Sequence, residues 1–210
     1  MLKPHDINAE GNQIAGWYNP SDLMDRTIQW FEDNQQHADV GSVGADAAND
    51  WGFYEPKVDP TIKDSMDLPL TGSGPNVPLF EEWAQYLQSS LNEYRKLYPY
   101  CDEVRSYDIL EPMNIQRYYP GQGYFSWHCE NDGTTDDVSI SRHLVFTTYL
   151  NTVDDGGETE FFHQKCKIKP EKGLTMIFPS AWTHTHRGVT SETKTKYIMT
   201  GWYNFYNLNV

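Results

Sequence analysis

Hydrophobic residues in the first half of the chain recur every three or four positions, which is the spacing of amphipathic helices. One such pattern spans residues 21–37, where Ser21 stands in position to cap the first turn. A stronger pattern spans residues 80–98, with Pro78 near its start and Pro99 just beyond its end. Each predicted helix has an apolar stripe that must be covered, and we expect both stripes to pack on one face of a sheet.

Residues 39–77, between the two predicted helices, are rich in Gly, Asp, Pro and Ser and show no sustained periodicity. A connection of this length inside a compact domain is usually functional or mobile. Two interpretations stay open for it: a solvated surface loop, or a lid over a binding site.

The second half of the chain changes character from residue 104 onward, where short runs rich in Tyr, Phe, Thr, Ile and Val are broken by Gly, Asp, Asn and Pro. These runs predict strands over 115–119, 124–130, 143–150, 158–168, 174–178, 182–189 and 196–205. A double-sheet jelly roll fits them better than an immunoglobulin-type sandwich, because the Cys…Trp…Cys framework is missing.

The pattern therefore predicts a mainly β chain with flanking α-helices. No internal repeat or second-domain boundary is evident, so we expect one domain over 1–210. Within it, 1–103 would supply the N-terminal helices and the long loop, and 104–210 would form the jelly-roll core.

Composition narrows the class of partner. The 210 residues include 16 Lys and Arg against 30 Asp and Glu, a net charge of −14. Such an acidic protein is a poor candidate for binding nucleic-acid phosphates or an anionic membrane surface, so we expect neither partner. The aromatic content of 14% argues against disorder. Nothing in the sequence indicates the oligomeric state.

The cysteines favour a reducing compartment. Cys101, Cys129 and Cys166 are odd in number and widely spaced, which suggests neither a disulfide framework nor a thiolate zinc site. The first residues lack the apolar run of a signal peptide, and no stretch approaches the roughly 18 apolar residues of a membrane span. The sequence predicts a cytoplasmic protein.

Candidate chemistry gathers in the β-rich half. On a strand, His128 and Glu130 would point to the same face, because side chains alternate. His184 and His186 would also share a face, so either could complete a site from a neighbouring strand. Two His and one carboxylate with open positions opposite form the facial triad of non-haem Fe(II) oxygenases. His-x-Glu alone is weak evidence, because most occurrences are structural.

Several motifs surround this pair in a fixed order. They are YPGQGYFSWHCE at 119–130, Arg142, YLN at 149–151, GGETEF at 156–161, KPEKG at 169–173, FP at 178–179, HRGV at 186–189, KY at 196–197 and Trp202. Together they resemble the catalytic core of the 2-oxoglutarate/Fe(II)-dependent dioxygenases, specifically the prolyl 4-hydroxylase-like group of small bacterial or viral type. The resemblance implies a double-stranded β-helix, a form of jelly roll, supported by helices.

The resemblance assigns His128, Glu130 and His186 to the iron. It departs from the group at Glu130, because the commonest carboxylate ligand there is Asp. Asp132 has the same strand parity, but Asn131-Asp132-Gly133 is typical of a turn, so Glu130 is preferred. His186 matches the group's His-x-Gly motif, with Lys196 at the expected distance. His184 lacks both flanking features.

The resemblance also assigns four residues to the cosubstrate pocket. Lys196 would pair with the distal carboxylate of 2-oxoglutarate, and Tyr149 would hydrogen-bond the same carboxylate. Tyr119 would line the pocket, and Trp202 would lie close to the iron. The implied cofactors are Fe(II) with 2-oxoglutarate and O2 as cosubstrates, and ascorbate is a candidate reductant. His143 is expected to be structural or exposed.

The expected reaction is hydroxylation of a residue in a protein or peptide, with release of succinate and CO2. Proline is the first guess for that residue, on resemblance alone, because one fold serves many substrates. Two alternatives stay open. One is an oxygenase acting on a small molecule or nucleobase, and the nucleobase is disfavoured by the acidic charge. The other is a non-catalytic jelly-roll binding or structural protein with a vestigial metal site, which Glu130 keeps open.

Overall fold

The computed structural model describes residues 2–44, 57–131 and 139–206, and most of their regular structure is antiparallel sheet. Nine of the described strands form one large sheet in the order β1-β2-β12-β9-β14-β7-β5-β3, with β6 paired to the end of β14. Their bounds are β1 Lys3–Pro4, β2 Ala15–Tyr18, β3 Asp39–Val40, β5 Met66–Leu70, β6 Tyr107–Asp108, β7 Met113–Tyr118, β9 Arg142–Tyr149, β12 Leu174–Pro179 and β14 Lys196–Phe205.

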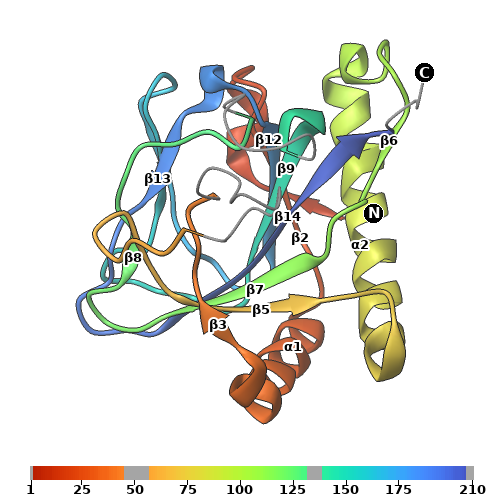
Figure 1. Ribbon diagram of the computed structural model, residues 1–210. Helices are drawn as coiled ribbons and strands as arrows, with labels where there is room; N and C mark the ends of the chain where they lie inside the picture. Colours follow the sequence, from red (N-terminus) through yellow and green to blue (C-terminus); the bar gives the residue numbers. More distant parts are fainter. Residues whose placement is uncertain (1, 45–56, 132–138, 207–210) are drawn as a thin grey trace, which may run out of the picture.

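A smaller sheet lies apart from the large one. It has the order β11-β10-β13, with bounds Cys166–Ile168, Thr159–Phe161 and His186–Gly188. A further pair joins β4 (Lys63–Asp64) to β8 (Gly123–Tyr124). Figure 1 shows β13 and β8 on one side of the large sheet and helix α2 on the other. The jelly-roll expectation is thus met by two facing sets of antiparallel strands.

Both predicted helices form, as α1 (Ser21–Asn34) and α2 (Val77–Leu97). The expectation that Ser21 caps α1 is wrong: Pro20 is the N-cap residue, and no side chain bonds to the first turn. The two helices are tied together where the Trp83 indole donates to the Thr27 hydroxyl at 2.9 Å. None of the helices in the described ranges has the length and apolar character of a membrane span.

The apolar stripe of α2 covers the large sheet, as its periodicity predicts. Trp83, Leu87 and Tyr94 are almost wholly buried in one hydrophobic cluster with Phe146 and Ile177 of the sheet. Complete burial of each large apolar side chain contributes about 1.5–3 kcal/mol. The helices therefore fix the outer face of the sheet and leave its other face to build the site.

The longest regular strands match their predicted segments, and the shorter ones differ. β14 has the predicted bounds, and β7, β9 and β12 shift by one or two residues at an end. The segment 158–168 is instead a hairpin, because the chain turns at 162–165, where Lys165 has φ 53°. In 182–189 the first residues form a 3-10 turn (Trp182–His184). In 124–130 the described pairing consists of Tyr124, at the end of β8, and an isolated bridge between His128 and His186.

The prediction of a long loop over 39–77 is wrong at its C-terminal end. β5 enters the large sheet there, between β7 and the two residues of β3. Its sequence contains Pro69, which disfavours a strand because proline has no N–H to donate. The register explains why Pro69 is tolerated: β3 pairs only with Asp67 and Met66, so no strand in the described part of the chain faces Pro69 on that side. Residues 45–56, on which the lid interpretation also depends, lie outside the described residues.

Candidate metal centre

A cavity of about 480 Å³ lies between residues of the large sheet and residues of the small sheet. Alternate residues of β14 line it, as expected for one face of a strand. They are Lys196, Ile198, Thr200 and Trp202. Residues of β7, β9 and β13 also line the cavity, together with the segment from His128 to Glu130 and residues of β4, β5, β8 and β10.

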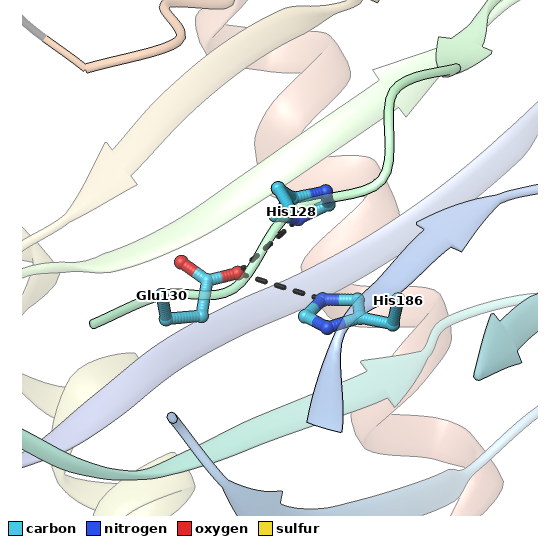
Figure 2. Close-up of side chains that lie close together, drawn as sticks. All are labelled: His128, Glu130 and His186. Carbon is cyan, nitrogen blue, oxygen red and sulfur yellow. Dashed lines mark ion pairs between the residues drawn. The ribbon is translucent and has the colours of Figure 1, made fainter. Parts of the chain in front are cut away.

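Three of these residues come together as a possible metal centre. One ligand atom each of His128, Glu130 and His186 lies within 4.8 Å of the others. The Glu130 Oε1 atom is 3.5 Å from His128 Nε2 and 3.6 Å from His186 Nε2 (Figure 2). The His128–His186 bridge sets this geometry, because each backbone N–H donates to the carbonyl of the other residue.

The outer nitrogens of both imidazoles are occupied. His128 Nδ1 lies 3.0 Å from the Ser126 carbonyl oxygen, and His186 Nδ1 lies 3.0 Å from the His184 carbonyl oxygen. A carbonyl can only accept, so each Nδ1 carries the hydrogen and each neutral ring presents the lone pair of Nε2. This is the usual orientation of metal-binding histidines, whose other nitrogen is fixed by a carbonyl or carboxylate.

The protonation states suit a cation. Burial and the nearby His186 lower the pKa of His128. Burial by itself would raise the pKa of Glu130, but its interactions with His128 and His186 outweigh burial and hold that pKa well below its ordinary range. An ionised carboxylate beside a neutral imidazole is the form that binds a metal.

The donor set therefore fits a divalent transition metal. Two imidazole nitrogens and a carboxylate oxygen converge in a buried space, where a bound cation would take the place of protons between them. Two imidazoles and one carboxylate on one side of a site suit Fe(II), with the remaining positions open to the cavity. Among the described residues, this is the one cluster of three or more His, Cys, Asp or Glu with such geometry.

Trp202, the predicted neighbour of the metal, contacts the carboxylate of the cluster. Its indole Nε1–H donates to Glu130 Oε2 at 3.1 Å. The guanidinium of Arg142 lies 3.6 Å from the centre of the same indole ring. The sequence motifs included Arg142 but predicted no contact for it.

Lys196 lies in the same cavity and is 5% exposed. Its Nζ donates to the Gly157 carbonyl oxygen at 3.1 Å. In the described part of the chain, no carboxylate is within ion-pair distance of it. Burial lowers the pKa of Lys196 to about 8, and the more distant charge of Glu158 opposes that shift. A buried ammonium with one neutral partner is suited to bind a carboxylate ligand.

Tyr149 also lines the cavity, but its hydroxyl already has protein partners. It lies 2.7 Å from Thr159 Oγ1 and 3.1 Å from the Ile168 carbonyl oxygen, and it accepts the Thr159 N–H at 3.2 Å. The predicted bond from Tyr149 to a cosubstrate would have to replace one of these contacts.

The expectation that Tyr119 lines the pocket is wrong. Tyr119 is 46% exposed and lies against Arg117, whereas Tyr118 lines the cavity. Adjacent side chains on a strand point to opposite faces, so an error of one residue moves the side chain out of the site. Tyr118 lies under Lys196, with Nζ 4.9 Å from the ring centre.

The remaining histidine candidates lie elsewhere. His184 does not share a face with His186, because it belongs to the 3-10 turn; its Nε2 is 3.0 Å from the Asn12 carbonyl oxygen. His143 bonds the Cys101 carbonyl oxygen at 3.0 Å, which agrees with a structural role. Asp132, the alternative carboxylate, lies outside the described residues.

Sequence reasoning missed a polar network in the cavity wall. Lys63 Nζ lies 2.6 Å from Asp67 Oδ2, which also accepts from the side-chain amides of Asn114 and Gln116 at 3.0 and 3.1 Å. The Ser65 hydroxyl donates to the other carboxylate oxygen at 2.7 Å. This network could not be predicted because residues 63–67 lie in the segment that was expected to be a loop.

Comparison with known proteins agrees with this geometry. Residues 113–204 match the family model of the 2OG-Fe(II) oxygenase superfamily. The chain is 27% identical over 150 residues to procollagen-lysine,2-oxoglutarate 5-dioxygenase 1 of Pongo abelii and of Bos taurus. These alignments cover 66% of the chain but 19% of each relative, so the chain spans about a fifth of their length.

Solved structures share the fold at low sequence identity. The viral collagen prolyl hydroxylase of Paramecium Bursaria Chlorella virus-1, in complex with 2OG, has a TM-score of 0.67 at 19% identity, covering 94% of this chain and 98% of that one. A prolyl-4-hydroxylase from Pseudomonas putida has a TM-score of 0.63 at 15% identity, covering 93% and 94%. A prolyl hydroxylase from Trichoplax adhaerens, in complex with a peptide fragment of hypoxia inducible factor, has a TM-score of 0.66 at 18% identity, covering 95% and 86%.

These matches confirm the predicted resemblance and the predicted double-stranded β-helix. They also support the expectation that the chain is an enzyme of the dioxygenase type, with Fe(II), 2-oxoglutarate and O2 as the cofactor and cosubstrates of the matched family.

Proposed function

We propose that this chain is a 2-oxoglutarate- and Fe(II)-dependent dioxygenase that hydroxylates a residue of a protein or peptide, with proline the first candidate. The observation that carries the proposal is the convergence of His128, Glu130 and His186 in a cavity that also holds the buried ammonium of Lys196. The metal-binding cluster and the isolated cation together match what a metal and a dicarboxylate require.

In this proposal His128 and His186 bind iron through Nε2, and Glu130 binds it through Oε1. Iron held there would supply oxidative decarboxylation chemistry, in which one oxygen atom of O2 would enter succinate as 2-oxoglutarate loses CO2 and the other would enter the substrate C–H bond as a hydroxyl group. The chain holds the three ligands on one side of the metal, and their fixed tautomers keep the lone pairs directed at it.

Lys196 would bind the distal carboxylate of 2-oxoglutarate. The ammonium is buried, and no carboxylate of the described residues forms an ion pair with it, so a carboxylate there would restore the charge balance that burial disturbs. Tyr118 packs beneath the ammonium, and the Gly157 carbonyl fixes its position. Thr159 and Tyr149 supply further hydroxyls on the same wall.

Two observations support the proposal of a polypeptide substrate: the names of the matched proteins and the aromatic surface beside the cavity. The matched proteins are named for collagen lysine and prolyl hydroxylation, and one is bound to a peptide. Next to the cavity, Trp127 and Phe162 are 37% and 55% exposed. Trp127 and Phe162 meet edge to face with ring centres 5.2 Å apart, while Arg187, which lines the cavity, lies over Trp127. Exposed aromatic rings of this kind can pack on proline-containing segments.

Two further points belong to the proposal. Ascorbate would serve to return the metal to Fe(II) after turnovers that do not oxidise substrate. Residues 1–210 would act as one unit, because the helices in the N-terminal half pack on the outer face of the sheet that carries the site.

The test combines the full chain with Fe(II), 2-oxoglutarate, ascorbate and O2. Substrates are a proline-containing peptide library and a matched lysine-containing library, with the Glu130→Ala variant as control. We expect succinate formation and the mass of one added oxygen atom on a peptide in the proline set. Modification in the lysine set alone would keep the reaction class and overturn the choice of proline. Absence of both succinate formation and metal-dependent 2-oxoglutarate binding would favour a non-catalytic jelly-roll protein.

A further inference from the structure

The two oxygens of the Glu130 carboxylate have different surroundings. Oε1 faces the Nε2 atoms of His128 and His186 at 3.5 and 3.6 Å. Oε2 points away from them: it accepts the indole N–H of Trp202 at 3.1 Å and lies 3.6 Å from Arg142 Nη1. One oxygen is thus directed at the candidate metal position, and the other is directed at a hydrogen-bond donor and a cation.

The groups that hold Oε2 are themselves fixed. Arg142 forms a two-point ion pair with Glu111, with Nε–Oε1 and Nη2–Oε2 distances of 2.9 and 2.6 Å. Glu111 Oε1 also accepts from the Asn204 side-chain amide at 2.7 Å. The Arg142 guanidinium stacks on the Trp202 indole, with its carbon 3.6 Å from the ring centre. Trp202 lies on β14, where its register partner is Val145 of β9.

We propose that Trp202 is a positioning residue, backed by Arg142, that holds Oε2 so that Oε1 alone faces the metal, and that this centre is built for glutamate and not for aspartate. The inference rests on the proposed metal centre and concerns how the chain orients its carboxylate ligand. A glutamate side chain has one more rotatable bond than aspartate, so it loses more freedom when it is fixed at a metal. The Trp202 bond restricts that freedom before the metal binds.

The arrangement makes a prediction that runs against the usual preference for aspartate in such triads. Replacing Glu130 with Asp withdraws the carboxylate by one C–C bond, about 1.5 Å. It can then reach either toward Trp202 or toward the two imidazoles, but not both, because the Glu130 N–H is held by the Ser180 carbonyl at 3.0 Å and the backbone at 128 by its bridge to His186. Substitution by the commoner ligand should therefore weaken metal binding.

The experiment is a Co(II) titration of the full chain, followed by the visible absorption of the bound ion, for the wild type, Glu130→Asp, Trp202→Phe and the double variant. Trp202→Phe removes the N–H and keeps an aromatic ring for Arg142 to stack on. Trp30→Phe is the matched control, because it also removes one indole hydrogen bond, of 3.2 Å to Asn76, on helix α1. Thermal melts check that each variant folds.

We expect Glu130→Asp and Trp202→Phe each to weaken Co(II) binding by about 10- to 100-fold, the usual effect of losing a hydrogen-bond partner of a metal ligand. The double variant should bind Co(II) about as tightly as whichever single variant has the lower affinity, because both changes remove the same contact between Trp202 and Glu130. Trp30→Phe should bind as the wild type does. Glu130→Asp leaves the Trp202 ring in place, so wild-type Co(II) affinity in that variant overturns the inference even if Trp202→Phe does not fold.

Wild-type affinity in Glu130→Asp, or in a folded Trp202→Phe, would overturn this inference while leaving the proposed function intact. The inference would also be overturned if the losses in Co(II) binding free energy of the two single variants added fully in the double variant. Full additivity would mean that Trp202 acts on something other than Glu130. If the wild type itself fails to bind Co(II) or Fe(II), the proposed metal centre fails, and the inference fails with it.

Discussion

Charge is buried in different ways in two regions of the cavity. The metal region consists of His128, Glu130 and His186, and the Lys196 region consists of Lys196, Gly157 and Tyr118. In the metal region, one oxygen of Glu130 accepts from Trp202 and lies near Arg142, and each imidazole bonds a backbone carbonyl. In the Lys196 region, the ammonium bonds the Gly157 carbonyl and no other polar group among the described residues, and burial lowers its pKa to about 8. One region is electrostatically supported by the protein, and the other is left unsatisfied.

The metal region therefore fixes the positions of the metal ligands, whereas the Lys196 region provides affinity for a carboxylate. Groups that the protein already satisfies keep their orientation whatever binds, which is useful where a metal demands defined ligand positions. A buried charge without a counter-ion destabilises the fold and gains most from an incoming carboxylate, so that region discriminates by charge. The cavity therefore combines a preorganised half with a half whose stability depends on the ligand.

The largest expected effect tests the preorganised half. Replacing Glu130 or His186 with Ala should abolish measurable Fe(II) or Co(II) binding, because two ligands do not hold a divalent ion against water. His184→Ala should retain metal binding within a few-fold, since the His184 ring bonds the Asn12 carbonyl and is not part of the cluster. Metal titration with thermal melts checks all three. If His184→Ala loses the metal and His186→Ala keeps it, the ligand assignment is wrong.

The second prediction tests the unsatisfied half. Lys196→Met should weaken 2-oxoglutarate binding by about 100-fold while leaving Co(II) binding in place. The same variant should be more stable than the wild type in the absence of 2-oxoglutarate. Lowering the pKa from 10.5 to about 8 corresponds to at most about 3 kcal/mol of destabilisation. Loss of the bond to Gly157 offsets part of the gain.

The sign of that gain depends on pH. The folded protein releases the Lys196 proton near pH 8 and the unfolded chain near 10.5, so between these values the unfolded state binds more protons and wild-type stability rises with pH. The advantage of Lys196→Met should be full below about pH 8 and vanish above about 10.5. Chemical denaturation at pH 7 and pH 10 measures it. A variant less stable than the wild type at pH 7 would mean that Lys196 is already well compensated.

A smaller effect concerns the pH dependence of cosubstrate binding. Only the protonated form of Lys196 attracts a dicarboxylate, so the Kd of 2-oxoglutarate should begin to rise above about pH 8, approaching tenfold per pH unit. Calorimetric titration of the Co(II)-loaded chain between pH 7 and 9 measures the slope. The Lys196→Met variant supplies the baseline, since its weak binding should not share this slope. A Kd that stays constant across this range would indicate a different anchor.

The sequence predicts most of the fold wherever periodicity persists. β14 and α2 are long, and their alternating or helical apolar patterns survive from end to end, so both are found close to their predicted bounds. β5 could not be predicted, because Pro69 and the charged Asp67 obscure a five-residue strand. Its place between β3 and β7 depends on long-range pairing that no local pattern records.

The residues of the candidate site could be named from the sequence, but the backbone elements that bring them together could not. His128, Glu130 and His186 were named from motifs, yet the predicted strands that would align them are largely absent. A single backbone bridge brings His128 and His186 together, and the 3-10 turn removes His184 from the face it was expected to share. The contact of Trp202 with Glu130 depends on side-chain direction across two elements, which a motif cannot state.

The smallest expected effect separates two neighbouring tyrosines at the Lys196 region. The Tyr118 hydroxyl donates to Gln116 Oε1 at 2.7 Å inside the cavity, whereas Tyr119 is half exposed. Tyr118→Phe should cost about 1 kcal/mol of stability, because it leaves a buried acceptor without its donor, and should raise the 2-oxoglutarate Kd by a few-fold. Tyr119→Phe should change neither by a measurable amount. Denaturation and calorimetry on the matched pair check this. A larger effect on 2-oxoglutarate binding from Tyr119→Phe would restore the assignment by resemblance, and would mean that the face of β7 assigned to the cavity is wrong.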